Sequence, residues 1–96
     1  MKCIDFEKII SKASIIDVRD YEDFFRAHIP NSRNISHVEL ILHPGLYMEV
    51  DKTYYIICDK GEISEHVIKM LKSTQYKLVN ITDGFDNWKG PIESLC

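Results

Sequence analysis

Short apolar runs rich in β-branched and aromatic residues constrain the fold of this 96-residue chain more than any other feature. Each run is bounded by polar or turn residues, and the runs cover Ser14 to Val18, Arg33 to Ile35, Lys52 to Cys58 and Lys77 to Ile81. Runs of this length and composition predict buried β-strands.

Segments with helical spacing separate these runs. Asp20 can cap a helix over Tyr21 to Ala27, and apolar residues on one face predict another helix from Ile63 to Ser73. Apolar strands that alternate with helices indicate a parallel sheet covered on both faces, because each parallel connection needs a long crossover. We therefore expect an α/β fold with three layers, in which a mostly parallel sheet lies between helices.

The length and charge of the chain narrow its organisation and its partners. A hydrophobic content of 45% in a chain of this size predicts a single domain over residues 1–96. The net charge is −3, and the lysines and arginines are scattered, which argues against nucleic-acid and anionic-membrane partners. The first residues lack the apolar core of a signal peptide, and no apolar run could span a bilayer, so we expect a cytoplasmic protein.

Three cysteines, Cys3, Cys58 and Cys96, form an odd set without a C-x-x-C pair. This pattern argues against a disulfide framework, a zinc site and a thioredoxin-type redox pair, so no metal is expected. Cys3 and Cys96 lie near the chain ends, where exposure is common. Either could serve as a resolving thiol, and inert positions are the favoured interpretation.

Cys58 follows the central apolar run, at the place where parallel sheets bind ligands. The segment from Cys58 to Ser64 joins a predicted strand to a predicted helix, and Gly61 allows a left-handed turn within it. Unpaired N–H groups of such a loop and helix terminus favour an anion, and a thiolate or a persulfide is one. The alternative is that Cys58 is simply a small buried apolar residue.

Three motifs resemble the rhodanese, or thiosulfate sulfurtransferase, superfamily over almost the whole chain. The first is Ile15-Ile16-Asp17-Val18-Arg19 with Glu22, Phe24, His28-Ile29-Pro30 and Asn34-Ile35, and it has Ala27 where glycine is usual. The second is Tyr55-Ile56-Ile57-Cys58 followed by Gly61 and Ser64, and the third is Asp83-Gly84-Phe85 with Trp88. Their order and spacing identify a single-domain, rhodanese-like fold.

The resemblance implies a sulfurtransferase or sulfur carrier that needs no cofactor. Cys58 would take sulfur from a persulfide or similar donor and pass it to a thiol or another nucleophile. The backbone amides of the loop would hold the anions, and the loop consists of Asp59, Lys60, Gly61, Glu62, Ile63 and Ser64. Donor and acceptor could be small molecules or proteins, and a partner protein is possible.

One residue departs from the family pattern. Many members carry an arginine just before the position of Ser64, where this chain has Ile63. Because Asp59 and Glu62 add negative charge to the loop, a small dianion such as thiosulfate should bind poorly. A protein or low-molecular-weight persulfide is the expected donor.

Other polar residues receive structural interpretations. By the resemblance, Asp17, Arg19 and Glu22 form an ion-pair and hydrogen-bond group behind the site. His28 is expected to bind backbone carbonyls at a helix end. The segment from Val38 to Tyr47 could form one wall of the pocket or pack inward. No metal-ligand spacing links the remaining histidines, which are expected at the surface: His37, His43 and His66.

Two other functions compete with sulfur transfer. The first is a binding or regulatory module in which the fold persists and catalysis has weakened, as the loss of the arginine would allow. The second is phosphatase chemistry, which needs a longer loop and an arginine to surround a phosphate. Ser64 occupies the place of that arginine, which argues against a phosphatase.

Overall fold

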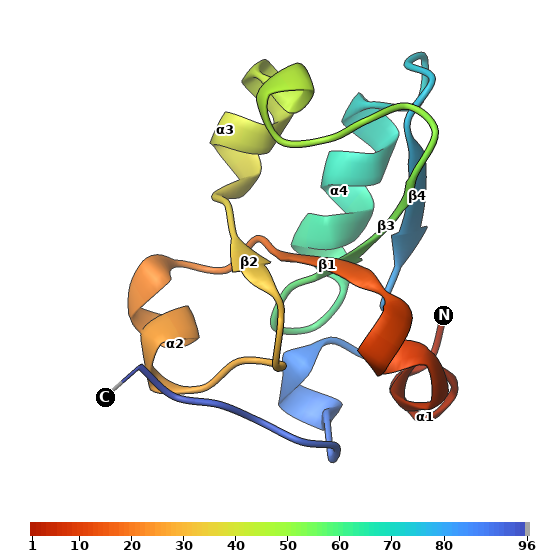
Figure 1. The fold of residues 1–96 in the computed structure, drawn as a ribbon. Helices are drawn as coiled ribbons and strands as arrows, with labels where there is room; N and C mark the ends of the chain where they lie inside the picture. Colours follow the sequence, from red (N-terminus) through yellow and green to blue (C-terminus); the bar gives the residue numbers. More distant parts are fainter. Residues whose placement is uncertain (96) are drawn as a thin grey trace.

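A computed structural model describes residues 1–95 and contains one four-stranded parallel sheet with the strand order β2-β1-β3-β4 (Figure 1). The strands are β1 (Ser14–Asp17), β2 (Arg33–Asn34), β3 (Thr53–Ile57) and β4 (Lys77–Asn80). The α-helices are α1 (Cys3–Phe6), α2 (Tyr21–Arg26), α3 (His37–Leu42) and α4 (Glu62–Met70). Three 3₁₀ helices complete the described elements: η1 (Glu7–Lys12), η2 (Pro44–Leu46) and η3 (Phe85–Asn87).

The central strands β1 and β3 carry the core of the sheet. They pair in register from Ser14 with Tyr54 to Asp17 with Ile57. Successive side chains of a strand point to opposite faces, so each central strand supplies apolar groups to two separate layers. The predicted α/β fold, with helices on both faces of a parallel sheet, is therefore confirmed.

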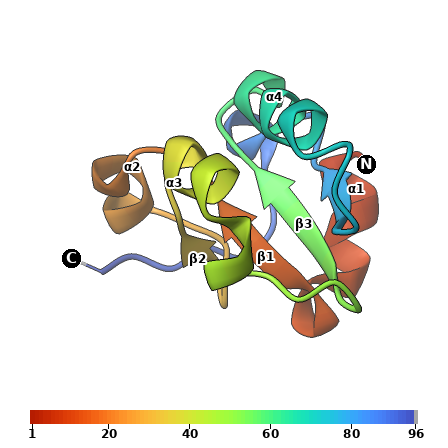
Figure 2. The same cartoon turned by 90° about the horizontal axis from the view of Figure 1, so that it is seen from above.

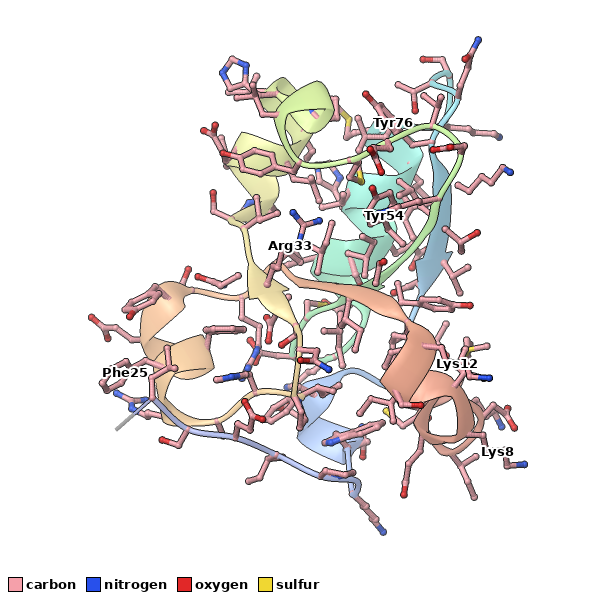
Figure 3. All side chains as sticks on the ribbon, viewed as in Figure 1. Lys8, Lys12, Phe25, Arg33, Tyr54 and Tyr76 are labelled. Carbon is pink, nitrogen blue, oxygen red and sulfur yellow. The ribbon has the colours of Figure 1, made fainter. Side chains whose placement is uncertain are left out.

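One face of the sheet is covered by α3 and α4, as the view in Figure 2 shows. Tyr54, Ile56 and Cys58 of β3 and the loop after it point to this face. They pack in one buried cluster with residues of the two helices, including Leu40, Val67 and Leu71. Tyr54 lies in this layer, whereas Lys8 and Lys12 point outward from η1 (Figure 3).

The opposite face is covered by α1 and η1 and by the closing segment, which we define as residues 81–88 after β4. Phe6 of α1 is fully buried, and its ring packs 5.1 Å from that of Tyr55 and 6.0 Å from that of Trp88, measured between centroids. Ile15 and Ile57 supply the sheet side of this second cluster.

No helix among residues 1–95 has the length and apolar composition that crossing a bilayer requires.

The observed helices differ from the predicted ones mainly where the sequence pattern that marks a helix is short. Asp20 stands at the N-cap position of α2, but its side chain makes no capping hydrogen bond; its backbone carbonyl accepts from the first turn instead. Residues 3–12 and 37–42 form helices that we did not predict. Each helix is short, and its burial against the sheet stabilises it more than its own propensity.

Two loops lock together at the carboxyl edge of the sheet. Gly61 and Gly84 have φ angles of 88° and 74°, a conformation that glycine adopts without steric cost. A Cβ atom on Gly84 would overlap the backbone of Asp59, and one on Gly61 would overlap the carbonyl of Thr82. The absence of a side chain at both positions therefore lets the loop after β3 and the loop after β4 touch through their backbones.

We expect Gly84→Ala to lower the free energy of unfolding by about 2–4 kcal/mol, because it adds left-handed strain and a backbone overlap. Urea unfolding followed by circular dichroism measures this loss. The matched control is Gly45→Ala, since a Cβ there would meet only the Tyr76 hydroxyl at 3.4 Å, an ordinary contact. Equal stability of the two variants would contradict the close approach.

Candidate active site

Cys58 lies directly after β3, with 1% of its surface exposed. Its Sγ accepts hydrogen bonds from the backbone N–H groups of Gly61 at 3.1 Å and Ser64 at 3.4 Å. Two backbone donors aimed at one sulfur stabilise negative charge on it more than they stabilise a neutral thiol. Negative charge on this sulfur would therefore be stabilised by fixed backbone donors.

The turn at Gly61 creates this arrangement. Gly61 is the N-cap residue of α4 in a left-handed conformation, and the helix begins at Glu62. The chain consequently curls around the sulfur before it enters the helix. The free N–H groups of a helix start then face inward, where an anion complements them.

A polar network surrounds Ser64, whose side chain is fully buried. The Ser64 Oγ lies 3.3 Å from the Cys58 Sγ and donates to the Asn80 Oδ1 at 2.5 Å. The Asn80 Nδ2 donates in turn to the Gly61 carbonyl at 3.2 Å. The sequence motifs do not identify Asn80 as a site residue. Its one signal in the sequence is that it is a polar residue at the end of an apolar strand, at the carboxyl edge of the sheet.

The mouth of the site is acidic. A cavity of about 200 Å³ is lined by Cys58 and by the side of the loop that includes Asp59, Lys60, Glu62 and Ile63. Burial raises the pKa of the Asp59 carboxyl, the nearby Asp86 carboxylate raises it further, and Arg19 opposes the shift. Ile63 is 41% exposed at this rim, where its side chain offers no charge to an anion.

Behind the site, Asp17 and Arg19 form a buried ion pair. The Arg19 Nη2 lies 2.8 Å from the Asp17 Oδ2 and also donates to the Ala27 carbonyl at 2.6 Å. The Arg19 guanidinium lies 4.1 Å from the centre of the Phe85 ring, so it connects the end of β1 to the closing segment. Glu22 does not join this group: its side chain is exposed on the first turn of α2, and it forms no ion pair within residues 1–95.

His28 is buried after α2 and contacts the backbone as expected. Its Nδ1 lies 2.7 Å from the Phe24 carbonyl, and its ring stacks on that of Phe24 with 3.9 Å between centroids. An antiparallel bridge between His28 and Glu93 attaches the C-terminal segment to the end of α2. These contacts connect His28 to the framework of the fold and not to the sulfur.

Several other expectations need correction. Cys3 is not exposed: it is buried in α1, its Sγ donates to the Gly84 carbonyl at 3.4 Å, and burial, with the Asp83 carboxylate, raises the pKa of its thiol. Cys96 lies outside the described residues. His43 and His66 are exposed, whereas His37 is half-buried. The segment from Val38 to Tyr47 does not line the Cys58 cavity; Leu40 packs into the core, while Val38 and Leu42 face outward.

The described part of the chain holds no group of three or more His, Cys, Asp or Glu side chains arranged to bind a metal ion. The polar atoms nearest to the Cys58 sulfur belong to the backbone and to Ser64.

Comparison with known proteins agrees with this geometry. The family model of the rhodanese-like domain matches residues 4–91. A rhodanese-related protein from Thermoplasma volcanium superimposes with a TM-score of 0.88 at 26% identity, and the match covers 100% of this chain and 97% of that one.

Two curated relatives match over most of this chain. It is 33% identical over 81 residues to the putative sulfur carrier protein YrkF of Bacillus subtilis, covering 83% of this chain and 43% of YrkF. It is 32% identical over 80 residues to the adenylyltransferase and sulfurtransferase uba4 of Ogataea parapolymorpha, covering 82% of this chain and 21% of that protein. The chain thus spans less than half the length of either relative.

Arg19→Met should destabilise the protein by about 3–5 kcal/mol, because it leaves the Asp17 carboxylate buried without its partner. Urea unfolding provides the measurement. The matched control is Arg26→Met, which removes an exposed pair with Asp23 at 3.7 Å and should change stability by no more than about 0.5 kcal/mol. A loss as small as that of the control would show that the buried pair contributes little.

Proposed function

The chain belongs to the rhodanese-like domain family, and on that premise we propose that it moves sulfane sulfur through a persulfide on Cys58. The loop from Asp59 to Ser64 would bind the transferred sulfur and its donor. Asp17 and Arg19 would support this loop from behind, and His28 would stabilise the surrounding fold. We place the reaction in the cytoplasm, where reducing conditions keep Cys58 free to accept sulfur.

The proposed reaction has two displacement steps. In the first, the Cys58 thiolate attacks the outer sulfur of a donor persulfide; the S–S bond of the donor breaks, and the donor leaves as a thiolate. In the second, the thiolate of an acceptor attacks the outer sulfur on Cys58, and the Cys58 thiolate is restored. No electrons are gained or lost overall, because one sulfane sulfur moves between thiols.

The observation that carries the proposal is the pair of backbone N–H groups that point at the Cys58 Sγ. Thiolate and persulfide are both anions, and fixed backbone donors favour both without reorganising. A sulfur that served only to fill the core would not need two polar donors.

The names of the relatives support the same class of chemistry. YrkF is named as a putative sulfur carrier, and the Ogataea relative as an adenylyltransferase and sulfurtransferase. Because this chain spans only part of each, we extend to it sulfur transfer alone. Its donor, its acceptor and any partner protein are inferred from the site.

The charge at the mouth disfavours a donor that concentrates two negative charges on one small group. Asp59 and Glu62 flank the cavity, Asp86 lies within electrostatic reach of Asp59, and Ile63 provides no cation. Among the described residues that line the cavity, Lys60 is the cation that offsets them. A dianion such as thiosulfate would be repelled, whereas a persulfide on a small thiol or on a protein would approach more readily.

A catalytically weakened binding or regulatory module is the second candidate. The observation in its favour is that only 1% of the Cys58 surface is exposed, so a donor must displace part of the loop to reach the sulfur. Sulfur uptake by Cys58 separates the two candidates.

We expect the reduced protein to gain one sulfur atom at Cys58 when it is incubated with glutathione persulfide. Intact mass and peptide mapping measure the gain, and Cys58→Ser is the control that should remain unchanged. Thiosulfate, tested separately, should load far less. No added sulfur from either donor would favour the binding module.

Ile63→Arg should increase loading from thiosulfate by about tenfold, because a guanidinium at the rim would bind the dianion through charge-assisted hydrogen bonds. The initial rate of sulfur loading measures the effect. Ile63→Gln is the matched control, since it adds a polar side chain of similar length without charge. A similar gain in both variants would show that polarity, and not charge, limits thiosulfate.

A further inference from the structure

We propose that Asn80 is a positioning residue for the sulfur of Cys58, an inference that rests on the proposed persulfide function. The two residues whose N–H groups bond to the Cys58 Sγ are Gly61 and Ser64. The side chain of Asn80 holds these same two residues, by accepting from the Ser64 Oγ at 2.5 Å and donating to the Gly61 carbonyl at 3.2 Å.

The backbone of Asn80 is fixed by the sheet. Asn80 is the last residue of β4 and pairs with Ile56 of β3, and the next N–H, of Ile81, donates to the Ile56 carbonyl at 3.0 Å. Ile56 is fully buried. The Asn80 amide therefore extends from a rigid strand to a curled loop, which is how a precise donor geometry is maintained.

The loop needs such support, because its conformation is not set by its own regular structure. Gly61 lies outside the helix with a φ of 88°; its carbonyl accepts from the Asn80 Nδ2 and the Glu65 N–H, and the Ser64 Oγ lies 3.1 Å from it. Of these donors, only Asn80 comes from outside the loop and α4. Loss of the Asn80 side chain would leave the turn to be held by its own residues.

Asn80 is uncharged, so its removal takes no ionised group from the site. The charged groups around the sulfur, its loop and Asn80 are the N-terminal ammonium, which donates to the Asn80 carbonyl at 2.6 Å, and the side chains of Asp17, Arg19, Asp23, Asp59, Lys60, Glu62 and Asp86. All of them remain in Asn80→Ala. A change in the behaviour of the sulfur would then reflect the placement of its hydrogen-bond partners, which are the two N–H groups and the Ser64 hydroxyl.

The test is the rate at which iodoacetamide alkylates Cys58, followed by peptide mapping at pH 7 and at pH 10. The rate at high pH reports access to the sulfur, and the ratio of the two rates reports how well the site stabilises the anion. We expect Asn80→Ala to lower the ratio of the rate at pH 7 to that at pH 10 by about three- to tenfold.

The matched control is Asn34→Ala. Asn34 ends the opposite edge strand, β2, is half-buried like Asn80, and also makes two side-chain hydrogen bonds, to the carbonyls of Asp17 and Arg19. Its loss should leave the ratio unchanged. If Asn80→Ala raises both rates equally, or leaves both unchanged, Asn80 does not position the sulfur.

A second variant covers the case in which Asn80→Ala does not fold. Asn80→Thr introduces a β-branched side chain suited to a strand, but its single hydroxyl is too short to bridge Gly61 and Ser64. We expect the same fall in the ratio, and an unchanged ratio in this folded variant would overturn the proposal.

Sulfur loading from glutathione persulfide completes the experiment. If the wild-type protein loads sulfur, the variant should load more slowly at pH 7 in proportion to its lower alkylation ratio. If the wild type takes up no sulfur, the persulfide function fails, while the alkylation ratio still decides whether Asn80 positions the sulfur.

Discussion

The site depends on the contact between the loop that follows β3 and the segment that follows β4. The N–H of Phe85 donates to the Cys58 carbonyl at 2.7 Å, and that of Asp86 to the Asp59 carbonyl at 3.0 Å. Only a glycine at position 84 allows the two backbones to approach this closely. These bonds satisfy the first two carbonyls of the loop, while the N–H groups of Gly61 and Ser64 bond to the sulfur.

This contact also explains why residues far from the sulfur matter to it. Arg19 is held by Asp17 at the end of β1 and packs against the ring of Phe85, so the buried ion pair supports the closing segment. On the other side, the Cys3 thiol donates to the carbonyl of Gly84. The loop around Cys58 is thus fixed through a second loop, which is itself fixed from both sides.

The strands, the helices α2 and α4 and the position of Cys58 could be predicted because they follow from apolar periodicity and from the rule that parallel sheets bind ligands at their carboxyl edge. The family motifs added Gly61, Ser64 and the Asp17–Arg19 pair. Glu22 was assigned wrongly to that pair, since a motif does not say which way a side chain on the first turn of a helix points. The helix of residues 3–12 and the burial of Cys3 depend on packing against a sheet formed by distant residues. Asn80 escaped prediction for the same reason: its two partners lie 16 and 19 residues away.

Burial of the sulfur creates a conflict between two requirements, which are aligned N–H groups and access for the molecule that delivers sulfur. A loop held rigidly around Cys58 keeps its N–H donors aligned, but it also leaves only 1% of the residue exposed. A donor must reach the sulfur through the cavity lined by Lys60, Glu62 and Ile63, all of which are exposed at its rim. These three residues belong to the part of the loop that faces solvent, while Gly61 and Ser64 face the sheet and Asn80. Access to the sulfur and alignment of its N–H donors therefore depend on different residues of one short segment.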